Sequence, residues 1–178
     1  MKNAWINYKA SDFFDELLTS NSNPRIAARA LVKYFKGISR EEMEQRASAA
    51  RLAIRDMGVC FSLASDDGDP DRPWPFDIIP RTIGSEIWSA VALGLKQRTK
   101  ALNLFIDDIY NSQNILAAGV VPADAVLKSP NFKSACLGVS PPFKAWANIC
   151  GTDLVRDESG SFLVLEDNLR IPSGVAYM

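Results

Sequence analysis

The chain has 178 residues, of which 47% are hydrophobic, and its formal net charge is −1. That much apolar material is enough for one globular domain with a buried core, and the near-zero charge argues against a strongly basic nucleic-acid-binding surface. The sequence contains no histidine, and its three cysteines form no CxxC pair. Histidine-dependent nucleophilic triads are therefore excluded, and a zinc site is not expected.

The amino terminus has no continuous apolar segment typical of a signal peptide, and no later run approaches the length of a membrane span. The three cysteines, Cys60, Cys136 and Cys150, lie far apart within apolar stretches. Such a distribution is typical of buried, reduced thiols. We therefore expect a cytoplasmic protein that associates with neither membranes nor nucleic acid.

The first quarter of the chain predicts an arm followed by a helix. Residues 1–23 mix aromatic and acidic side chains and are expected to pack on the domain as an arm. Pro24 suits the first turn of a helix, and apolar residues then recur at helical spacing until Gly37. This pattern predicts a helix over residues 24–36.

A second helix is predicted over residues 40–57, because Ser39 followed by Glu42 forms a capping-box pattern. A short strand is expected to begin at Val59. The segment 66–75 is rich in aspartate and proline, and it is expected to be a solvated loop. Its acidic residues lack the ligand spacing and the closing glutamate of an EF-hand calcium loop.

The longest helical pattern covers residues 85–110, where apolar residues form one broad stripe. Short helices are expected at residues 122–128 and 131–136. The predicted core residues of this middle region are Phe76, Ile78, Ile79, Leu95, Leu102, Phe105 and Ile109.

The last quarter predicts an antiparallel β-hairpin spanning about residues 145–168. Alternating apolar residues flank the turn-forming segment Asp157–Gly160. The fold class is therefore a mixed α/β (α+β) fold in one region. It has a mainly helical part over residues 24–140 and a hairpin and loop over 141–178.

Three oxygen-bearing side chains converge on this hairpin. Asp153 begins one arm, and Glu166 and Asn168 end the other, where their spacing of two places them on the same face of a strand. Magnesium favours such hard oxygen ligands and leaves positions for water and nucleotide phosphates. On spacing alone, ordinary polar residues at strand ends remain the commoner explanation.

A donor-rich loop follows the hairpin. Arg170, Ser173 and Gly174 lie close together in sequence and can hold an anion in a tight turn. Taken alone this pattern is weak, because many loops contain serine and glycine.

Four ordered sequence blocks resemble one known family. Residues 165–177 read LEDNLRIPSGVAY, which closely resembles the EDN-x-R-x-PSG-x-x-Y motif of the circularly permuted ATP-grasp proteins of the second type. Three further blocks agree in order and spacing, at residues 75–81, 94–103 and 151–156. Together the blocks cover roughly residues 70 to 178.

The resemblance implies an incomplete ATP-grasp-like fold and an ATP-dependent ligase activity that joins a carboxylate to an amine through an acyl phosphate. The family is similar to the synthetase half of glutathionylspermidine synthetase, in which Mg²⁺ ions bridge the ATP phosphates. It implies that Asp153, Glu166 and Asn168 bind the metal. Arg170, Ser173 and Gly174 are the candidate ATP-contacting residues, with Arg170 as the candidate catalytic cation.

Two departures from the family pattern limit this implication. Gly151 stands where the related synthetase carries an arginine, which leaves the substrate specificity open. Family members also continue beyond the PSG motif into a nucleotide-clamping lobe. We therefore expect a fragment of a ligase, inactive alone, whose missing lobe a separate chain would supply. The alternatives are a non-catalytic remnant that acts as a binding or interaction module, and an unrelated soluble α/β domain.

Overall fold

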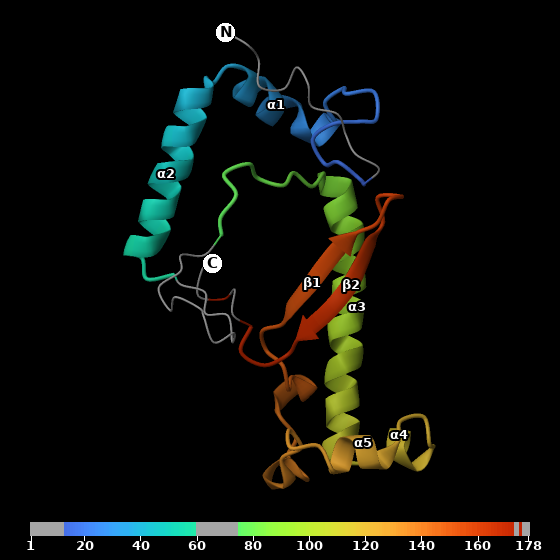
Figure 1. The fold of residues 1–178 in the computed structure, drawn as a ribbon. Helices are drawn as coiled ribbons and strands as arrows, with labels where there is room; N and C mark the ends of the chain where they lie inside the picture. The colour runs from blue at the N-terminus through green and yellow to red at the C-terminus, as the bar shows by residue number, and fades with distance from the viewer. Residues whose placement is uncertain (1–12, 60–74, 173–174, 176–178) are drawn as a thin grey trace. The chain divides into compact units, whose positions relative to one another are not determined.

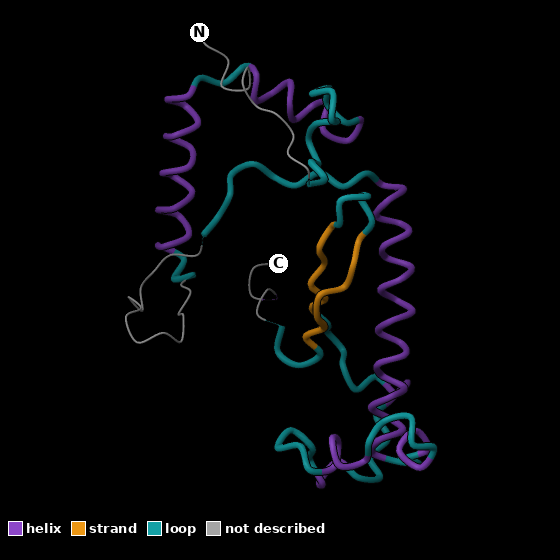
Figure 2. The backbone as a smooth tube through the Cα atoms, turned by 45° about the vertical axis from the view of Figure 1, so that its right-hand side comes forward, coloured by secondary structure: helices purple, strands orange, loops and turns teal. Residues whose placement is uncertain are grey.

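The computed structural model describes residues 13–59, 75–172 and 175. The chain divides into two compact units, residues 1–84 and 85–178. The helices and strands are drawn in Figure 1 and coloured by type in Figure 2. Unit 1 contains the 3-10 helix η1 (Ile26–Ala28), α1 (Arg29–Lys36) and α2 (Arg40–Asp56). Unit 2 contains α3 (Ser85–Tyr110), α4 (Asn114–Ala117), α5 (Ala123–Leu127), η2 (Ser134–Cys136), η3 (Pro142–Lys144), β1 (Gly151–Arg156) and β2 (Phe162–Asn168).

A small apolar core holds the start of unit 1 together. Leu18, Ala28 and Val32 are buried against one another. The first helix begins two residues later than predicted, because Pro24 forms an isolated β-bridge with Leu18 and Arg25 is extended. The described part of the predicted arm therefore packs on the helix that follows it.

The α2 helix confirms the prediction for residues 40–57 almost to its last residue. The Ser39 hydroxyl accepts a hydrogen bond from the Glu42 amide at 3.1 Å, which caps the helix. The Glu42 carboxylate instead pairs with Arg46 at 2.8 Å, so only one half of the capping box forms. The predicted strand beyond Val59 and most of the segment 66–75 lie outside the described residues.

The α3 helix has the predicted bounds, Ser85–Tyr110, and the short helix α4 that follows it was not predicted. The Asp108 carboxylate accepts hydrogen bonds from the amides of Asn114 and Ile115 at 3.1 and 2.9 Å. These bonds satisfy two amide groups that every helix start leaves unpaired. The Asp108 carboxylate near the end of α3 therefore caps the amino terminus of α4.

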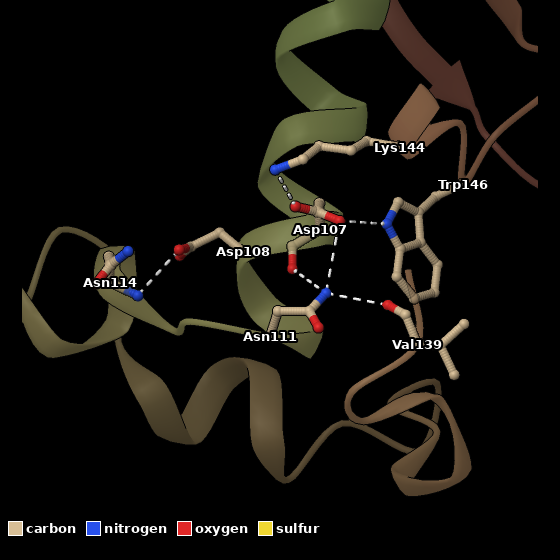
Figure 3. A network of polar contacts seen from close by, with 7 residues as sticks. All are labelled: Asp107, Asp108, Asn111, Asn114, Val139, Lys144 and Trp146. Carbon is tan, nitrogen blue, oxygen red and sulfur yellow. Dashed lines mark hydrogen bonds and ion pairs between the residues drawn. The ribbon is translucent and has the colours of Figure 1, made fainter. Parts of the chain in front are cut away.

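A buried carboxylate network fixes the segment 139–147 against the end of α3 (Figure 3). The Asp107 carboxylate accepts a hydrogen bond from the Trp146 indole at 3.3 Å and pairs with the Lys144 ammonium at 2.8 Å. Asn111 donates to the backbone carbonyl of Val139 at 3.1 Å. The hydrogen bond from Lys144 holds the pKa of Asp107 below its ordinary value, and burial opposes this shift.

The hairpin was predicted to begin at about residue 145, but residues 145–150 form no strand. Contacts with α3 explain the difference. The backbone amide of Ala147 donates to the Asn103 side chain at 2.8 Å, not to a neighbouring strand. A polar side chain of α3 therefore supplies the hydrogen bond that a neighbouring strand would otherwise accept from this amide. The hairpin itself is confirmed over β1 and β2, which pair antiparallel.

The predicted core is confirmed only in part. Ile109 is 6% exposed, whereas Phe76 is 57% exposed and was wrongly placed in the core. The remaining five predicted core residues are half-buried. Among the described residues, no helix combines the length and apolar character that a membrane span requires.

Candidate functional site

The register of the hairpin brings Asp153 and Glu166 together. Asp153 pairs directly with Glu166, but the next pair is Leu154 with Val164, so Leu165 is an extra residue in β2. Side chains of directly paired residues lie on the same face of an antiparallel sheet. Without this β-bulge, Asp153 would pair with Leu165 and lie on the face opposite Glu166. The bulge therefore places both carboxylates on one face.

Asn168 completes the group on that face. It follows Glu166 by two residues in β2, and its side-chain amide donates to Glu166 Oε1 at 2.9 Å. Asp153, Glu166 and Asn168 are all exposed. In the part of the chain that the structure describes, no other hydrogen bond or ion pair engages these three side chains. Their remaining oxygen atoms are free to accept a ligand.

The opposite face of the same strands is anchored to α3. Asp167, between Glu166 and Asn168, accepts a hydrogen bond from Arg98 Nε at 2.6 Å and one from the Thr152 hydroxyl at 2.9 Å. The Asp167 side chain is only 10% exposed. Both figures of the fold show the hairpin lying alongside α3. Alternation along β2 thus turns one acidic residue towards the helix and its two neighbours towards solvent.

Gly151 allows the segment after β2 to fold back on the hairpin. A Cβ atom at this position would lie 2.8 Å from Cβ of Pro172, closer than side chains approach. Gly151 also pairs with Asn168 across the hairpin. Any larger residue at position 151 therefore requires Pro172 to move.

The donor-rich loop is described only up to Pro172. Arg170 is exposed, and within the described residues no hydrogen bond or ion pair is formed by its guanidinium. Ile171 has a φ of 51°, a left-handed conformation that β-branched residues rarely adopt. Ser173 and Gly174 lie outside the described residues, so their predicted contacts with ATP stay predictions.

The donor set fits a hard divalent cation. Two carboxylates and one amide oxygen on one exposed face are the ligand types that Mg²⁺ takes, with water and phosphate completing its shell. Among the described residues, no cluster of three or more His, Cys, Asp or Glu side chains can hold a metal. The group on the hairpin contains two carboxylates and one amide, so a cation bound there would need further ligands from water or phosphate.

Sequence reasoning missed Arg98 and Asp167. Arg98 lies at helical spacing with Lys96 and Lys100, a pattern typical of a solvated helix face, and Asp167 stands between two candidate ligands. Alternation was the available signal for Asp167, because a strand residue between two outward-facing ligands must face inward. Its partner, 69 residues earlier in the chain, carries no local signal.

Comparison with known proteins decides the family. The family model for circularly permuted ATP-grasp proteins of type 2 matches residues 80–178, more than half of the chain. This chain belongs to that family. The matched residues include the whole of β1 and β2, and so the three oxygen-bearing side chains on the exposed face.

Several curated relatives of this family member are similar over nearly its whole length. An uncharacterized protein of Synechocystis is 44% identical over 172 residues, which are 97% of this chain and 36% of that protein. An uncharacterized protein of Mycobacterium leprae is 38% identical over 175 residues, 96% of this chain and 30% of that protein. The chain therefore spans about a third of the length of these relatives.

A third relative, from Frankia casuarinae, is provisionally named a glutamate–cysteine ligase. It is 35% identical over 164 residues, which are 92% of this chain and 19% of that protein. That name belongs to a protein of which only about a fifth of the sequence aligns with this chain.

Proposed function

We propose that this chain carries part of the Mg²⁺-ATP site of an ATP-dependent carboxylate–amine ligase. One observation carries the proposal: the bulged register that sets Asp153 opposite Glu166, with Asn168 beside them on the same exposed face. Two carboxylates this close repel one another, and a divalent cation relieves that repulsion. Membership of the ATP-grasp family supplies the nucleotide to which the cation would belong.

The three side chains of the exposed face would hold the cation, and Arg170 would contact the ATP phosphates from the adjoining loop. A bound Mg²⁺ supplies charge neutralisation while a phosphoryl group is transferred to the carboxylate substrate. The protein residues hold their oxygen atoms in place before the ligand arrives. That placement is their contribution, because phosphoryl transfer depends on positioning and electrostatic stabilisation.

We further propose that the chain is the amino-terminal part of the catalytic fold and is inactive by itself. It matches about a third of each of the two most similar relatives named above. Its exposed hairpin face also carries uncovered apolar side chains beside the acidic group, Val155, Leu163 and Leu165. Apolar surface of this kind is commonly covered by another part of a protein. A further lobe, on the same or a separate chain, would cover it and contribute the adenine contacts.

Titration calorimetry tests the metal site. The 178-residue chain is titrated with Mn²⁺, with and without ATP, beside a Glu166→Ala, Asn168→Ala double variant. We expect weak Mn²⁺ binding by the wild type and at least about a tenfold loss in the variant, because two of three protein ligands are removed. Lys100→Ala, which changes an exposed residue of α3, is the matched control. Equal Mn²⁺ affinity in the double variant and the wild type would refute the site.

An ATPase assay tests the second part of the proposal. We expect no detectable ATP hydrolysis by the purified chain, since several groups must act together in phosphoryl transfer. Robust hydrolysis by the chain alone would overturn the proposal that it is an inactive part of a larger fold.

A non-catalytic interaction module is the second candidate function. The uncovered apolar side chains of the hairpin favour it, because they suit contact with another protein surface. The metal titration separates the two candidate functions. The ligase site predicts Mn²⁺ binding that depends on Glu166 and Asn168, whereas an interaction module predicts no such binding.

A further inference from the structure

We propose that Arg98 and Asp167 are positioning residues that hold the three metal ligands of the hairpin in place from the opposite face of the sheet. This inference rests on the proposed metal site and adds to it two residues that do not touch the metal. The Arg98–Asp167 pair joins α3, the longest helix of the chain, to the strand that carries two of the three ligands.

Because of its place in β2, Asp167 can fix the positions of its two neighbours, Glu166 and Asn168. Glu166, Asp167 and Asn168 are consecutive, so fixing the Asp167 side chain fixes the backbone from which both ligands project. The 2.6 Å contact with Arg98 is charge-assisted, and such bonds are about twice as strong as neutral ones. The Asp167 side chain is 10% exposed and the Arg98 side chain is 47% exposed, so solvent screens the pair mainly from the arginine side.

Thr152 extends the same anchor to β1. It pairs with Asp167 in the register, and its hydroxyl donates to Asp167 Oδ1 at 2.9 Å. Thr152 directly precedes Asp153, the third ligand. One carboxylate therefore ties together the two strands at the residues adjacent to all three ligands. The anchor lies one residue pair away from the bulge, which falls between the pairs Asp153–Glu166 and Leu154–Val164.

The bulge explains why such an anchor is needed. Bulged strands lose a regular ladder position and bend locally, so the ladder alone defines the positions of Asp153 and Glu166 poorly. A slip by one residue would move Glu166 to the other face. The hydrogen bonds of Asp167 to Arg98 and Thr152 exist only in the observed register and oppose that slip.

The charge of Arg98 gives the proposal a test by sign. Removing a cation near a metal site should, by Coulomb's law alone, strengthen binding of another cation. A positioning role predicts the reverse, because the ligands lose their fixed arrangement. We expect Arg98→Ala to weaken Mn²⁺ binding about tenfold, as is common when a residue that orients metal ligands is removed.

The experiment uses the full 178-residue chain and Mn²⁺ alone, with free Mn²⁺ measured by electron paramagnetic resonance. Lys100→Ala is the matched control, since it removes a cation from the same helix without an interaction among the described residues; it should leave affinity unchanged or slightly raised. Thr152→Val removes the hydrogen bond to Asp167 and keeps the shape of the side chain. It should lower the Mn²⁺ affinity less than Arg98→Ala does. If Arg98→Ala does not fold, Thr152→Val provides the test instead. Mn²⁺ binding by folded Arg98→Ala or by Thr152→Val that equals or exceeds the wild type overturns the proposal.

A measurement without metal separates this inference from the proposed function. The Asn168 side-chain amide protons are followed by nuclear magnetic resonance in the wild type and in Arg98→Ala. We expect both signals to move towards the values of a free amide, because the hydrogen bond to Glu166 loosens. Absence of Mn²⁺ binding by the wild type would sink the metal site, and the amide signals then decide positioning alone: unmoved signals overturn it and shifted signals uphold it.

Discussion

Two acidic side chains at the two ends of unit 2 lie in opposite environments: one is buried and hydrogen-bonded, and the other is exposed to solvent. At the carboxyl end of α3, Asp107 is 7% exposed and its carboxylate is engaged by Lys144, Trp146 and Asn111. On the outer face of the hairpin, Asp153 is exposed, and its carboxylate makes no hydrogen bond or ion pair with another described residue. A carboxylate that folding satisfies completely contributes structure. A carboxylate that folding leaves open retains its capacity to bind a ligand.

The largest expected effect sharpens this comparison through apolar packing. Ile109 is buried at the structural end, whereas Leu165 on the hairpin is 69% exposed. We expect Ile109→Ala to lower the free energy of unfolding by about 2–4 kcal/mol, because it removes buried methyl groups and leaves a cavity. Leu165→Ala should change it by less than about 0.5 kcal/mol. Urea denaturation of both variants measures the difference, and equal losses would contradict the contrast between the two ends.

A smaller effect is expected at Gly151, where the ligand face meets the folded-back segment. Gly151→Ala should destabilise by about 1–2 kcal/mol, because the new Cβ overlaps Pro172 and the backbone must shift. Gly94→Ala is the matched control, since a Cβ there meets nothing within 4 Å. That change should stabilise α3 by up to about 1 kcal/mol. Thermal melts give the two signs, and a stabilising Gly151→Ala would show that Pro172 yields freely.

The smallest expected effect separates the two ends by pH. The pKa of Asp107 is lowered, chiefly by the hydrogen bond from Lys144, so this carboxyl binds protons more weakly folded than unfolded. Its contribution is therefore full above the ordinary aspartate pKa, about 4, and is lost as pH falls below that value. We expect Asp107→Asn to make the acid decline of the melting temperature shallower. It should not become flat, because the Ser159 hydroxyl similarly lowers the pKa of Asp157.

The same Asp107→Asn variant should leave Mn²⁺ affinity at pH 7 unchanged, since Asp107 lies at the structural end. A calorimetric titration beside the pH series checks this. A loss of Mn²⁺ binding in Asp107→Asn would show that the two ends are not independent.

Local patterns predicted the elements that depend on local forces. The bounds of α2 and α3 followed from capping and apolar periodicity, and the hairpin turn followed from Asp157–Gly160. Residues 145–150 alternate like a strand, but Asn103 of α3 holds the backbone of Ala147 and Asp107 of α3 holds the indole of Trp146, about 40 residues earlier in the chain. Phe76 was placed in the core from its apolar neighbours alone. Contacts between distant segments leave no periodicity to find.

The candidate site divides in the same way. That Glu166 and Asn168 share a face follows from the period of a strand and could be predicted. That Asp153 joins them depends on the extra residue in β2, and the anchoring of Asp167 depends on Arg98, neither of which is visible in a local pattern.

The bulge at Leu165 means that the hairpin holds one residue more than a regular ladder needs to set Asp153 opposite Glu166. If Leu165 were removed, Glu166 would follow Val164 directly and pair with Asp153 in a regular ladder, so both carboxylates would stay on one face. If Leu165 instead took the ladder position opposite Asp153, the two carboxylates would point to opposite faces. The candidate site therefore depends on which residue of β2 the ladder leaves unpaired, and a relative that is one residue shorter at this point can keep the same arrangement.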